Sequence, residues 1–150
     1  MVSMLPIVEA DREAFMHLAV SHFRELDPSF VPHEDWREQY FPRILANPRC
    51  FLRWIIAEGS RAGFILFGVE DHRFLPRKTG VIYELYVLPV LRRRGLAKAI
   101  ARAAIAELWT HNPSKIQLEV MEGRTAAAVL WKSLGFHKAS ERFVLTGSGG

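Results

Sequence analysis

The stretch from Val81 to Met121 constrains the fold more than any other part of this sequence. An apolar run, Val81 to Leu88, ends at a proline, and an alanine-rich segment from Gly95 to Thr110 carries apolar side chains at every fourth position. A second alternating run, Ile116 to Met121, follows. Strand, helix and strand in this order predict a right-handed crossover that joins two parallel strands of one sheet.

The flanking segments supply the other elements of the predicted sheet. Two helices are expected before the crossover, from Asp11 as N-cap to about Leu26 and from about Glu34 to Asn47, with Pro42 interrupting the second. A short helix is expected at Thr125 to Leu134, with Gly135 as its C-cap glycine. Further strands are expected at Ser3–Val8, Phe51–Ala57, Ala62–Val69 and Phe136–Leu145, and a loop at His72–Gly80. This order predicts an α/β (mixed α+β) fold, with helices on both faces of a central mixed sheet.

Length and composition indicate one ordinary globular domain. The chain has 150 residues, of which 49% are hydrophobic and 24% charged. We expect a single domain over residues 1–145 and a flexible tail over residues 146–150, which read Thr-Gly-Ser-Gly-Gly. No basic segment followed by a long apolar run opens the chain, and no window is apolar enough to span a membrane, so a cytoplasmic location is expected.

Charge and cysteine content narrow the function classes. The single cysteine, Cys50, excludes an internal disulfide and a multi-cysteine metal site, and no metal site is expected. The net charge of +4 suits a nucleic-acid-binding domain or a protein that holds a polyanionic cofactor. Because the arginines are spread along the chain apart from Arg92 to Arg94, nucleic-acid binding is the less favoured of the two.

The loop that leads into the alanine-rich helix has features typical of an anion-binding site. The first turn of a helix leaves main-chain N–H groups unpaired and places partial positive charge there. The small residues Gly95 and Ala97 would let a phosphate approach the main chain closely, and the three arginines before them could add charge-assisted hydrogen bonds. We therefore expect a pyrophosphate on the amides of about Arg93 to Lys98, the alternative being a solvated basic helix start.

Two motifs in this region resemble those of a known family. Arg92-x-x-Gly95-x-Ala97 resembles the acetyl-CoA signature of the GNAT N-acetyltransferase superfamily, Gln/Arg-x-x-Gly-x-Gly/Ala. About 30 residues later, Arg124 to Phe136 resembles the superfamily's later helix, Asn-x-x-Ala-x-x-Leu-Tyr-x-x-x-Gly-Phe. The resemblance covers Val81 to Phe136 well and the first third of the chain only by the order of its elements.

The resemblance implies a fold, a cofactor and a site. The sheet would splay open between its fourth and fifth strands, and the pantetheine arm of acetyl-CoA would lie in that cleft. A main-chain amide at the strand end would polarise the thioester carbonyl. The residues that the resemblance and the anion site together assign to the cofactor are Tyr86, Val87, Arg92, Arg93, Arg94, Gly95, Leu96, Ala97, Lys98, Arg124 and Trp131.

Two positions depart from the family pattern. Arg124 stands where the family has asparagine, and Trp131 stands where it has the tyrosine that usually protonates the departing thiolate. An indole N–H donates hydrogen bonds but does not give up a proton near neutral pH. The acid could then be Tyr86, Tyr83 or water. Trp131 can equally be a packing residue, which leaves open a CoA-binding module without transferase activity.

Catalysis needs a base, because most acceptor amines are protonated near neutral pH. Glu84 is the first candidate, since it interrupts an apolar strand at the expected cleft, and Glu119 could assist it. The alternative for Glu84 is a carboxylate on a solvated sheet face or paired with an arginine. No serine or cysteine lies in a nucleophile setting, so direct attack in a ternary complex is expected. Three histidines are expected to be structural: His72, His111 and His137.

The acceptor is expected to be a primary amine of a small molecule or a peptide. Its site would come from about Phe23 to Tyr40 together with the loop at residues 72–80, where four acids could attract an amine and three aromatic rings could wall it. Surface charge and core packing explain the same residues equally well. These residues are Asp27, Glu34, Asp35, Glu38, Phe30, Trp36 and Tyr40. A homodimer is left open.

Overall fold

The computed structural model describes residues 1–147. It divides into two compact units, one from Met1 to Glu119 and one from Val120 onward, which are described separately. In the described residues no helix combines the length and the apolar character that crossing a membrane requires.

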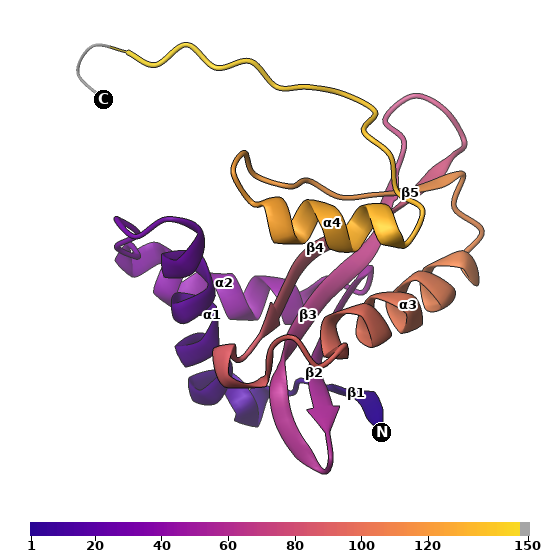
Figure 1. Cartoon of the computed structure of the whole chain (residues 1–150). Coiled ribbons are helices and arrows are strands. Elements are labelled where there is room, and N and C mark those ends of the chain that lie inside the picture. The colour runs from indigo at the N-terminus through magenta and orange to yellow at the C-terminus, as the bar shows by residue number, and fades with distance from the viewer. Residues whose placement is uncertain (148–150) are drawn as a thin grey trace. The chain divides into compact units, whose positions relative to one another are not determined.

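The first unit is built on one five-stranded mixed sheet (Figure 1). Neighbouring strands are antiparallel up to β4, and the last pair is parallel, as the crossover predicts. The strands lie across the sheet in chain order: β1 (Val2–Pro6), β2 (Cys50–Ala57), β3 (Ser60–Asp71), β4 (Lys78–Val87) and β5 (Lys115–Gln117).

Strands β4 and β5 pair only over a short stretch at the start of β4. β5 pairs with β4 only from Thr79 to Val81, and β4 continues to Val87 beyond the last pair. The predicted splay between the fourth and fifth strands is therefore present, and it leaves one edge of the second half of β4 without β5. The predicted strand Ile116–Met121 was too long for the same reason, because a strand persists only where it has a hydrogen-bonded neighbour.

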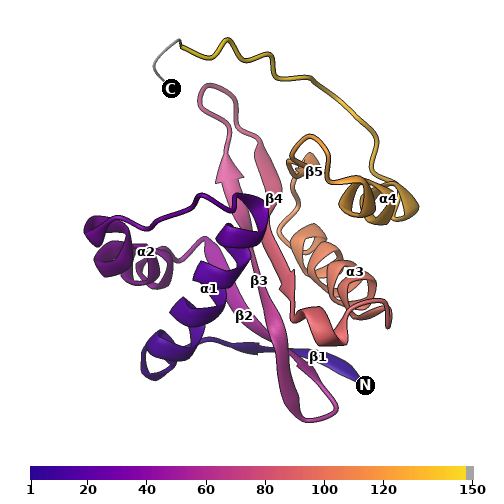
Figure 2. The same cartoon turned by 60° about the vertical axis from the view of Figure 1, so that its left-hand side comes forward.

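Helices α1 (Arg12–Leu26) and α2 (Glu34–Ala46) cover one face of this sheet (Figure 2). Their apolar stripes meet alternate side chains of β2, β3 and β4 in one core cluster. Its buried members are Ile7, Phe15, Ala19, Phe41, Leu52, Trp54, Phe64, Leu66 and Tyr86.

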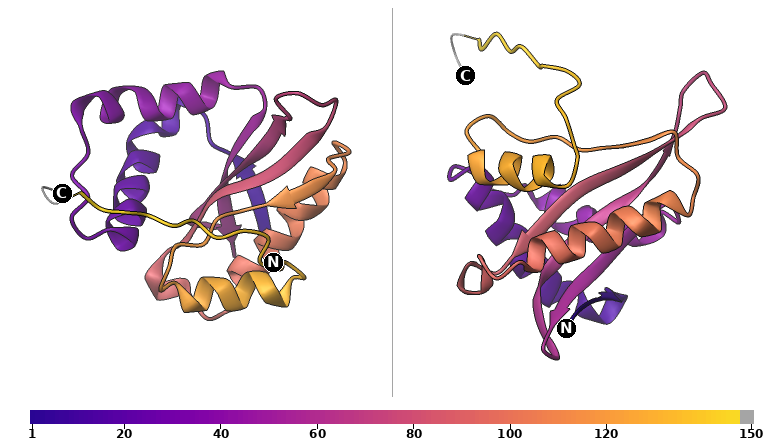
Figure 3. Two further views of the ribbon diagram at one scale, coloured as in Figure 1. Left: turned by 90° about the horizontal axis from the view of Figure 1, so that it is seen from above. Right: turned by 45° about the vertical axis from the view of Figure 1, so that its right-hand side comes forward.

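Helix α3 (Leu96–Trp109) covers the other face, as the view from above makes clear (Figure 3). Helix α3 buries Ile100, Ala104 and Leu108, which occupy every fourth position, as the sequence predicts. A bidentate ion pair joins this helix to β2, with Arg53 donating to Glu107 at 2.6 and 2.7 Å. Helices on both faces are thus confirmed.

Helix α2 runs unbroken through Pro42, so the predicted interruption is wrong. Proline has no N–H, and the carbonyl of Glu38, four residues earlier, loses its helical donor. The guanidinium of Arg12 donates to that carbonyl at 3.1 Å. A side chain of α1 therefore replaces the bond that Pro42 cannot make.

The loop expected at residues 72–80 and the capping role expected of Asp11 both differ from the prediction. The predicted loop at residues 72–80 shortens to six residues, because β3 runs to Asp71 and β4 starts at Lys78. Asp11 is the residue before α1, as predicted, but its carboxylate does not cap that helix. It instead accepts from the main chain of Val8 and from the side chains of Trp54 and Arg61 at 3.0, 3.2 and 2.8 Å.

The second unit contains helix α4 (Thr125–Ser133), which ends one residue before the predicted Leu134 and is followed by the predicted helix-ending glycine, Gly135. Gly135 has φ of 97°, and the N–H of Phe136 bonds back to the carbonyl of Trp131 at 3.1 Å, which closes the helix end. The strand predicted at Phe136–Leu145 is wrong, since residues 136–147 form neither helix nor strand. Alternating apolar residues need a neighbouring strand, and Phe143 to Leu145 are instead exposed. Of the predicted tail, residues 148–150 lie outside the described residues.

Candidate active site

The second half of β4 carries the predicted catalytic residues. A β-bulge at Tyr83 shifts the register, so that Leu66 of β3 faces Glu84 while Phe67 faces Ile82. After the bulge, Glu84 and Tyr86 point to the face that α1 and α2 cover. Bulges re-aim side chains, and this one turns Glu84 toward α1.

Glu84 is paired with a residue that the sequence reasoning missed. Nε2 of His22, on α1, lies 2.5 Å from Oε2 of Glu84. The side chain of His22 is 8% exposed and that of Glu84 is 22% exposed. The alternative partner that the sequence left open, an arginine, is not the one found.

The signal for His22 was its helical spacing. His22 follows Phe15 and Ala19 by seven and three residues, and all three are buried on the sheet-facing stripe of α1. A buried histidine needs a hydrogen-bond partner. Looking for a carboxylate on the strand that this stripe covers would have identified the pair.

Aromatic rings surround the pair. The imidazole of His22 lies 5.1, 5.7 and 5.4 Å from the rings of Phe23, Phe64 and Tyr86. Burial raises the pKa of the Tyr86 hydroxyl, and Glu25 adds to the rise. Burial and, secondarily, the negative charge of Glu84 raise the pKa of Tyr40 on α2. Both phenols therefore hold their protons firmly at neutral pH.

The main chain of β4 presents one edge to β3 and one to the splay. Leu88 donates its N–H to the carbonyl of Ala62 on β3 at 2.8 Å. Alternation along an antiparallel strand then turns the main chain of Tyr86 toward β3 and that of Leu85 and Val87 toward the splay. Gly63 of β3, which pairs with Val87, can have no side chain, because a Cβ there would lie 1.9 Å from the Tyr86 carbonyl oxygen.

The loop from Arg93 to Lys98 has the geometry of an anion cradle. Arg93 and Gly95 have φ of 64° and 78°, and Gly95 is the residue before α3. The first helical bond of α3 runs from the Ala99 N–H to the Gly95 carbonyl at 3.1 Å, so the amides before Ala99 are not part of the helical ladder. A Cβ at Gly95 would meet open space. Such a concave run of amides, with the exposed side chains of Arg93 and Arg94 beside it, suits a diphosphate.

Arg92 is placed differently from its two neighbours. Its Nε donates to the carbonyl of Val87 at 2.8 Å, and its NH2 donates to Glu25 of α1 at 2.7 Å. Its guanidinium also lies 5.5 Å from the centre of the Tyr86 ring. In this structure Arg92 therefore ties the loop to α1, and its donors are engaged within the protein.

The expected acceptor region divides into an aromatic cluster and a set of exposed acids. Phe23, Phe30, Trp36 and Tyr40 pack on one another with ring centres 4.8 to 5.8 Å apart. Through Phe23 and Tyr40 the cluster adjoins the His22–Glu84 pair. Of the four acids, Asp27 accepts from the N–H and hydroxyl of Ser29, which lower its pKa. The other three are exposed on α2: Glu34, Asp35 and Glu38.

Several other candidates are engaged in local structure. Tyr83 donates its hydroxyl to Glu70 at 2.6 Å. His72 accepts from the N–H groups of Phe74 and Leu75, and His111 stacks on Phe51. Glu119 is an exposed residue beyond the end of β5.

Cys50 shows no sign of a reactive thiol. It is half-buried, and burial raises the pKa of its thiol, which disfavours the nucleophilic thiolate. Among residues 1–147, no group of three or more histidine, cysteine or acidic side chains could hold a metal ion.

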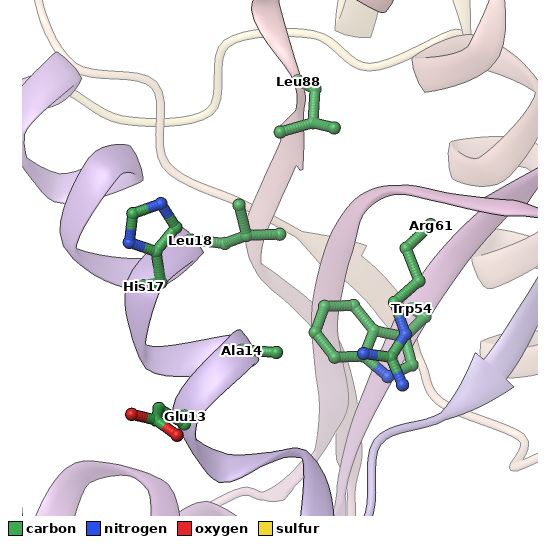
Figure 4. Close-up of a pocket in the computed structure, with 7 residues that line it drawn as sticks. All are labelled: Glu13, Ala14, His17, Leu18, Trp54, Arg61 and Leu88. Carbon is green, nitrogen blue, oxygen red and sulfur yellow. The ribbon is translucent and has the colours of Figure 1, made fainter.

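A shallow pocket of about 570 Å³ lies beside α1 and contains none of the predicted site residues (Figure 4). Figure 4 shows the Arg61 guanidinium beside the ring of Trp54, and the separation from its centre is 4.2 Å. The lining residues are Glu13, Ala14, His17, Leu18, Trp54, Arg61 and Leu88. The pocket is mainly apolar and offers no carboxylate–imidazole pair, so it is a weaker candidate for chemistry than the end of β4.

The second unit holds the remaining two predicted cofactor residues. Arg124 is the residue before α4, and Trp131 is a buried residue of α4 whose ring packs on Phe136 at 5.6 Å. Their role toward a cofactor stays a prediction.

The family model described as "Acetyltransferase (GNAT) family" matches residues 12–136. No curated protein sequence matches the chain.

Solved structures share the fold at low sequence identity. A transcriptional regulator from Bacillus halodurans C-125 is 17% identical, with a TM-score of 0.79 over 98% of this chain and 100% of the other. A ribosomal-protein-alanine N-acetyltransferase from Brucella melitensis biovar Abortus 2308 is also 17% identical, with a TM-score of 0.73 over 98% and 100%. An aminoglycoside 6'-N-acetyltransferase from Acinetobacter haemolyticus is 15% identical, with a TM-score of 0.76 over 97% and 98%.

Proposed function

This chain belongs to the GNAT acetyltransferase family, and on that premise we propose that it transfers the acetyl group of acetyl-CoA to a primary amine. The amine nitrogen forms the new C–N bond, the C–S bond breaks, and the products are an acetamide and free CoA. The acceptor is an amine of a small molecule or of a peptide. Among the fold relatives, one is named for an aminoglycoside and another for a ribosomal protein.

The loop before α3 fits the cofactor. Acetyl-CoA supplies an activated acetyl group and carries a diphosphate that needs donors. The amides of about Arg93 to Lys98 supply those donors, and the open space at Gly95 admits the phosphate oxygens. Arg93, Arg94 and Lys98 add positive charge, while Arg92 holds the loop in place.

The single observation that carries the proposal is the position of Glu84. It is a part-exposed carboxylate in the apolar stretch Val81–Val87 of β4, three residues beyond the last pair with β5. A carboxylate there can take a proton from the acceptor ammonium, directly or through water, so that the neutral amine attacks. The N–H of Val87, on the edge of β4 that faces the splay, would polarise the carbonyl under attack.

The departing CoA thiolate needs little acid catalysis. Free thiols have a pKa near 8.5, so CoA is a fair leaving group. Tyr86 is the proposed proton donor, because its phenol is protonated at neutral pH and lies two residues after Glu84 on the same face of β4. Burial raises the pKa of this phenol, which makes it a weak acid, so its contribution to the rate should be modest. The domain boundary at residue 145, a cytoplasmic location and a homodimer stay predictions.

The test is a thiol-release assay with acetyl-CoA and a panel of amines, together with calorimetry of CoA binding. Release that depends on the amine, with the acetamide identified by mass spectrometry, is the expected result. Binding of CoA without release for any amine would favour the alternative of a non-catalytic CoA-binding module, which the tryptophan at position 131 suggests. No binding of CoA or acetyl-CoA would overturn the proposal.

A further inference from the structure

We infer that His22 is a positioning residue for the catalytic carboxylate: its Nε2–H holds Oε2 of Glu84, so that Oε1 stays turned toward the acceptor amine. The inference rests on the proposed function, because it needs Glu84 to act as the base. Its own observation is the 2.5 Å contact between a strand and a helix 62 positions apart in sequence.

Relative burial decides which member of the pair meets the substrate. The His22 side chain is 8% exposed and lies on the stripe of α1 that faces the sheet. Glu84 is 22% exposed. The carboxylate is thus the open member and the imidazole the deep one, so His22 acts through Glu84 and not on the amine itself.

The chemistry of the contact fixes the donor. An ionised carboxylate only accepts, so Nε2 of His22 carries the hydrogen. A hydrogen bond to a charged acceptor is stronger than one between neutral groups, and this bond favours one carboxylate rotamer. With Oε2 engaged, the lone pairs of Oε1 remain for the proton that the amine gives up.

The residues around His22 restrict the movement of its imidazole. The rings of Phe23, Phe64 and Tyr86 enclose the imidazole on three sides. The titratable groups that face the pair are the hydroxyls of Tyr86 and Tyr40, and beyond Tyr86 lie Glu25 and Arg92. Within residues 1–147, the ion pair that Glu84 forms is with His22 and not with a lysine or arginine, so His22 is the donor that holds it.

A double-mutant cycle tests the inference. His22→Phe keeps an aromatic ring but removes the donor, and it should lower kcat about 10-fold or more with little change in KM for acetyl-CoA. In the Glu84→Gln background the same change should cost almost nothing, because His22 acts only through that carboxylate. His22→Gln, which can donate to the carboxylate, should recover most of the lost rate.

Three outcomes would overturn the inference while leaving the proposed function intact. They are an equal loss from His22→Phe in both backgrounds, no recovery in His22→Gln, and a change confined to KM for acetyl-CoA. If the wild-type chain transfers no acetyl group, the proposed function fails first, so the two failures are distinguishable.

Proton NMR of the wild-type chain provides a readout that does not depend on the stability of the phenylalanine variant. An imidazole N–H bonded to a carboxylate should resonate downfield of the amide region. That signal should move or vanish in Glu84→Gln. A spectrum unchanged by Glu84→Gln would overturn the inference as well.

Discussion

The two ends of the proposed site are built in opposite ways. At the end of β4, Glu84 and Tyr86 are side chains packed against helix α1, and Glu84 is held by His22. In the loop that follows, the useful groups are main-chain amides around Gly95, and the arginine side chains at 93 and 94 are exposed. The function proposed for the strand end depends on the identity of its side chains. The function proposed for the loop depends on the path of its main chain.

This difference determines what a substitution should do at each end. Side-chain changes at the strand end should alter the rate and leave cofactor binding in place. In the loop, only changes that alter the backbone or fill its open space should remove binding, and loss of a single charge should have a modest effect. Arg92 belongs to the loop by sequence but to the strand end by its contacts, which makes it the most informative exception.

The largest effect is expected from Gly95→Glu. A side chain at this φ of 78° is strained, and the added carboxylate would stand in the space that the diphosphate needs. We expect CoA affinity to fall about 1000-fold, or roughly 4 kcal/mol, as measured by calorimetry.

Gly59→Glu is the matched control. Gly59 has φ of 79°, and a Cβ there also meets open space, but it lies in the β2–β3 turn. Equal loss of CoA binding in both variants would mean that backbone strain, not the cradle, explains the result.

Glu84→Gln should follow, with kcat about 100-fold lower near neutral pH and CoA affinity unchanged. The deficit should shrink as pH rises, because more of the acceptor amine is already neutral and needs no base. The measurement is a pH–rate profile for both proteins. Glu70→Gln, which removes a carboxylate charge on the neighbouring strand, beside Tyr83, should leave the profile unchanged. A deficit that is flat across pH would argue for a structural role of Glu84.

Substitutions of Arg93 and Arg94 should affect CoA binding, whereas substitution of Arg92 should affect stability. Arg93→Ala and Arg94→Ala should each weaken CoA binding about 3- to 10-fold, with less effect at high salt and an unchanged Tm. Arg92→Ala should instead lower stability by about 1 kcal/mol, since it removes bonds to Val87 and Glu25. If Arg92→Ala weakens CoA binding with no change in Tm, Arg92 is a phosphate ligand as the motif predicts.

Asp11→Asn lies outside both ends and should have the smallest effect. The N–H of Val8, with Trp54 and Arg61, lowers the pKa of Asp11. A lowered pKa in the folded state means that the stabilisation is present at neutral pH and is lost as pH falls through that value. We expect Asp11→Asn to cost about 1 kcal/mol at neutral pH and nothing in strong acid, measured by denaturant unfolding at several pH values. A pH-independent difference would contradict this account.

Elements that a local sequence pattern determines could be predicted. Elements that depend on contacts between residues far apart in the sequence could not. The crossover from β4 through α3 to β5 follows from periodicity, and the start of α3 directly after Gly95 was predictable in the same way. That the loop before α3 binds an anion stays a prediction. The continuity of α2 through Pro42 could not be predicted, because it depends on Arg12. The length of β5 and the absence of a strand at residues 136–145 depend on whether a neighbouring strand is available.

The same distinction applies to the site. Glu84 could be identified from its own strand, as a charge in an apolar run. The engagement of Arg92 with Glu25 joins residues 67 positions apart, and no spacing rule indicates it. His22 lies between these cases, since its burial was predictable from the helix alone, whereas its partner could be identified only by asking which strand that helix covers.

The bond from Arg12 to the Glu38 carbonyl has a consequence for how this face of the molecule opens. A defect in α2 is repaired only when α1 is docked, so α2 is complete only in the presence of α1. Amide hydrogen exchange should therefore report α1 and α2 as one cooperative opening unit. The aromatic rings beside His22 would then be released together, and the deep member of the catalytic pair would be exposed to solvent in that one event.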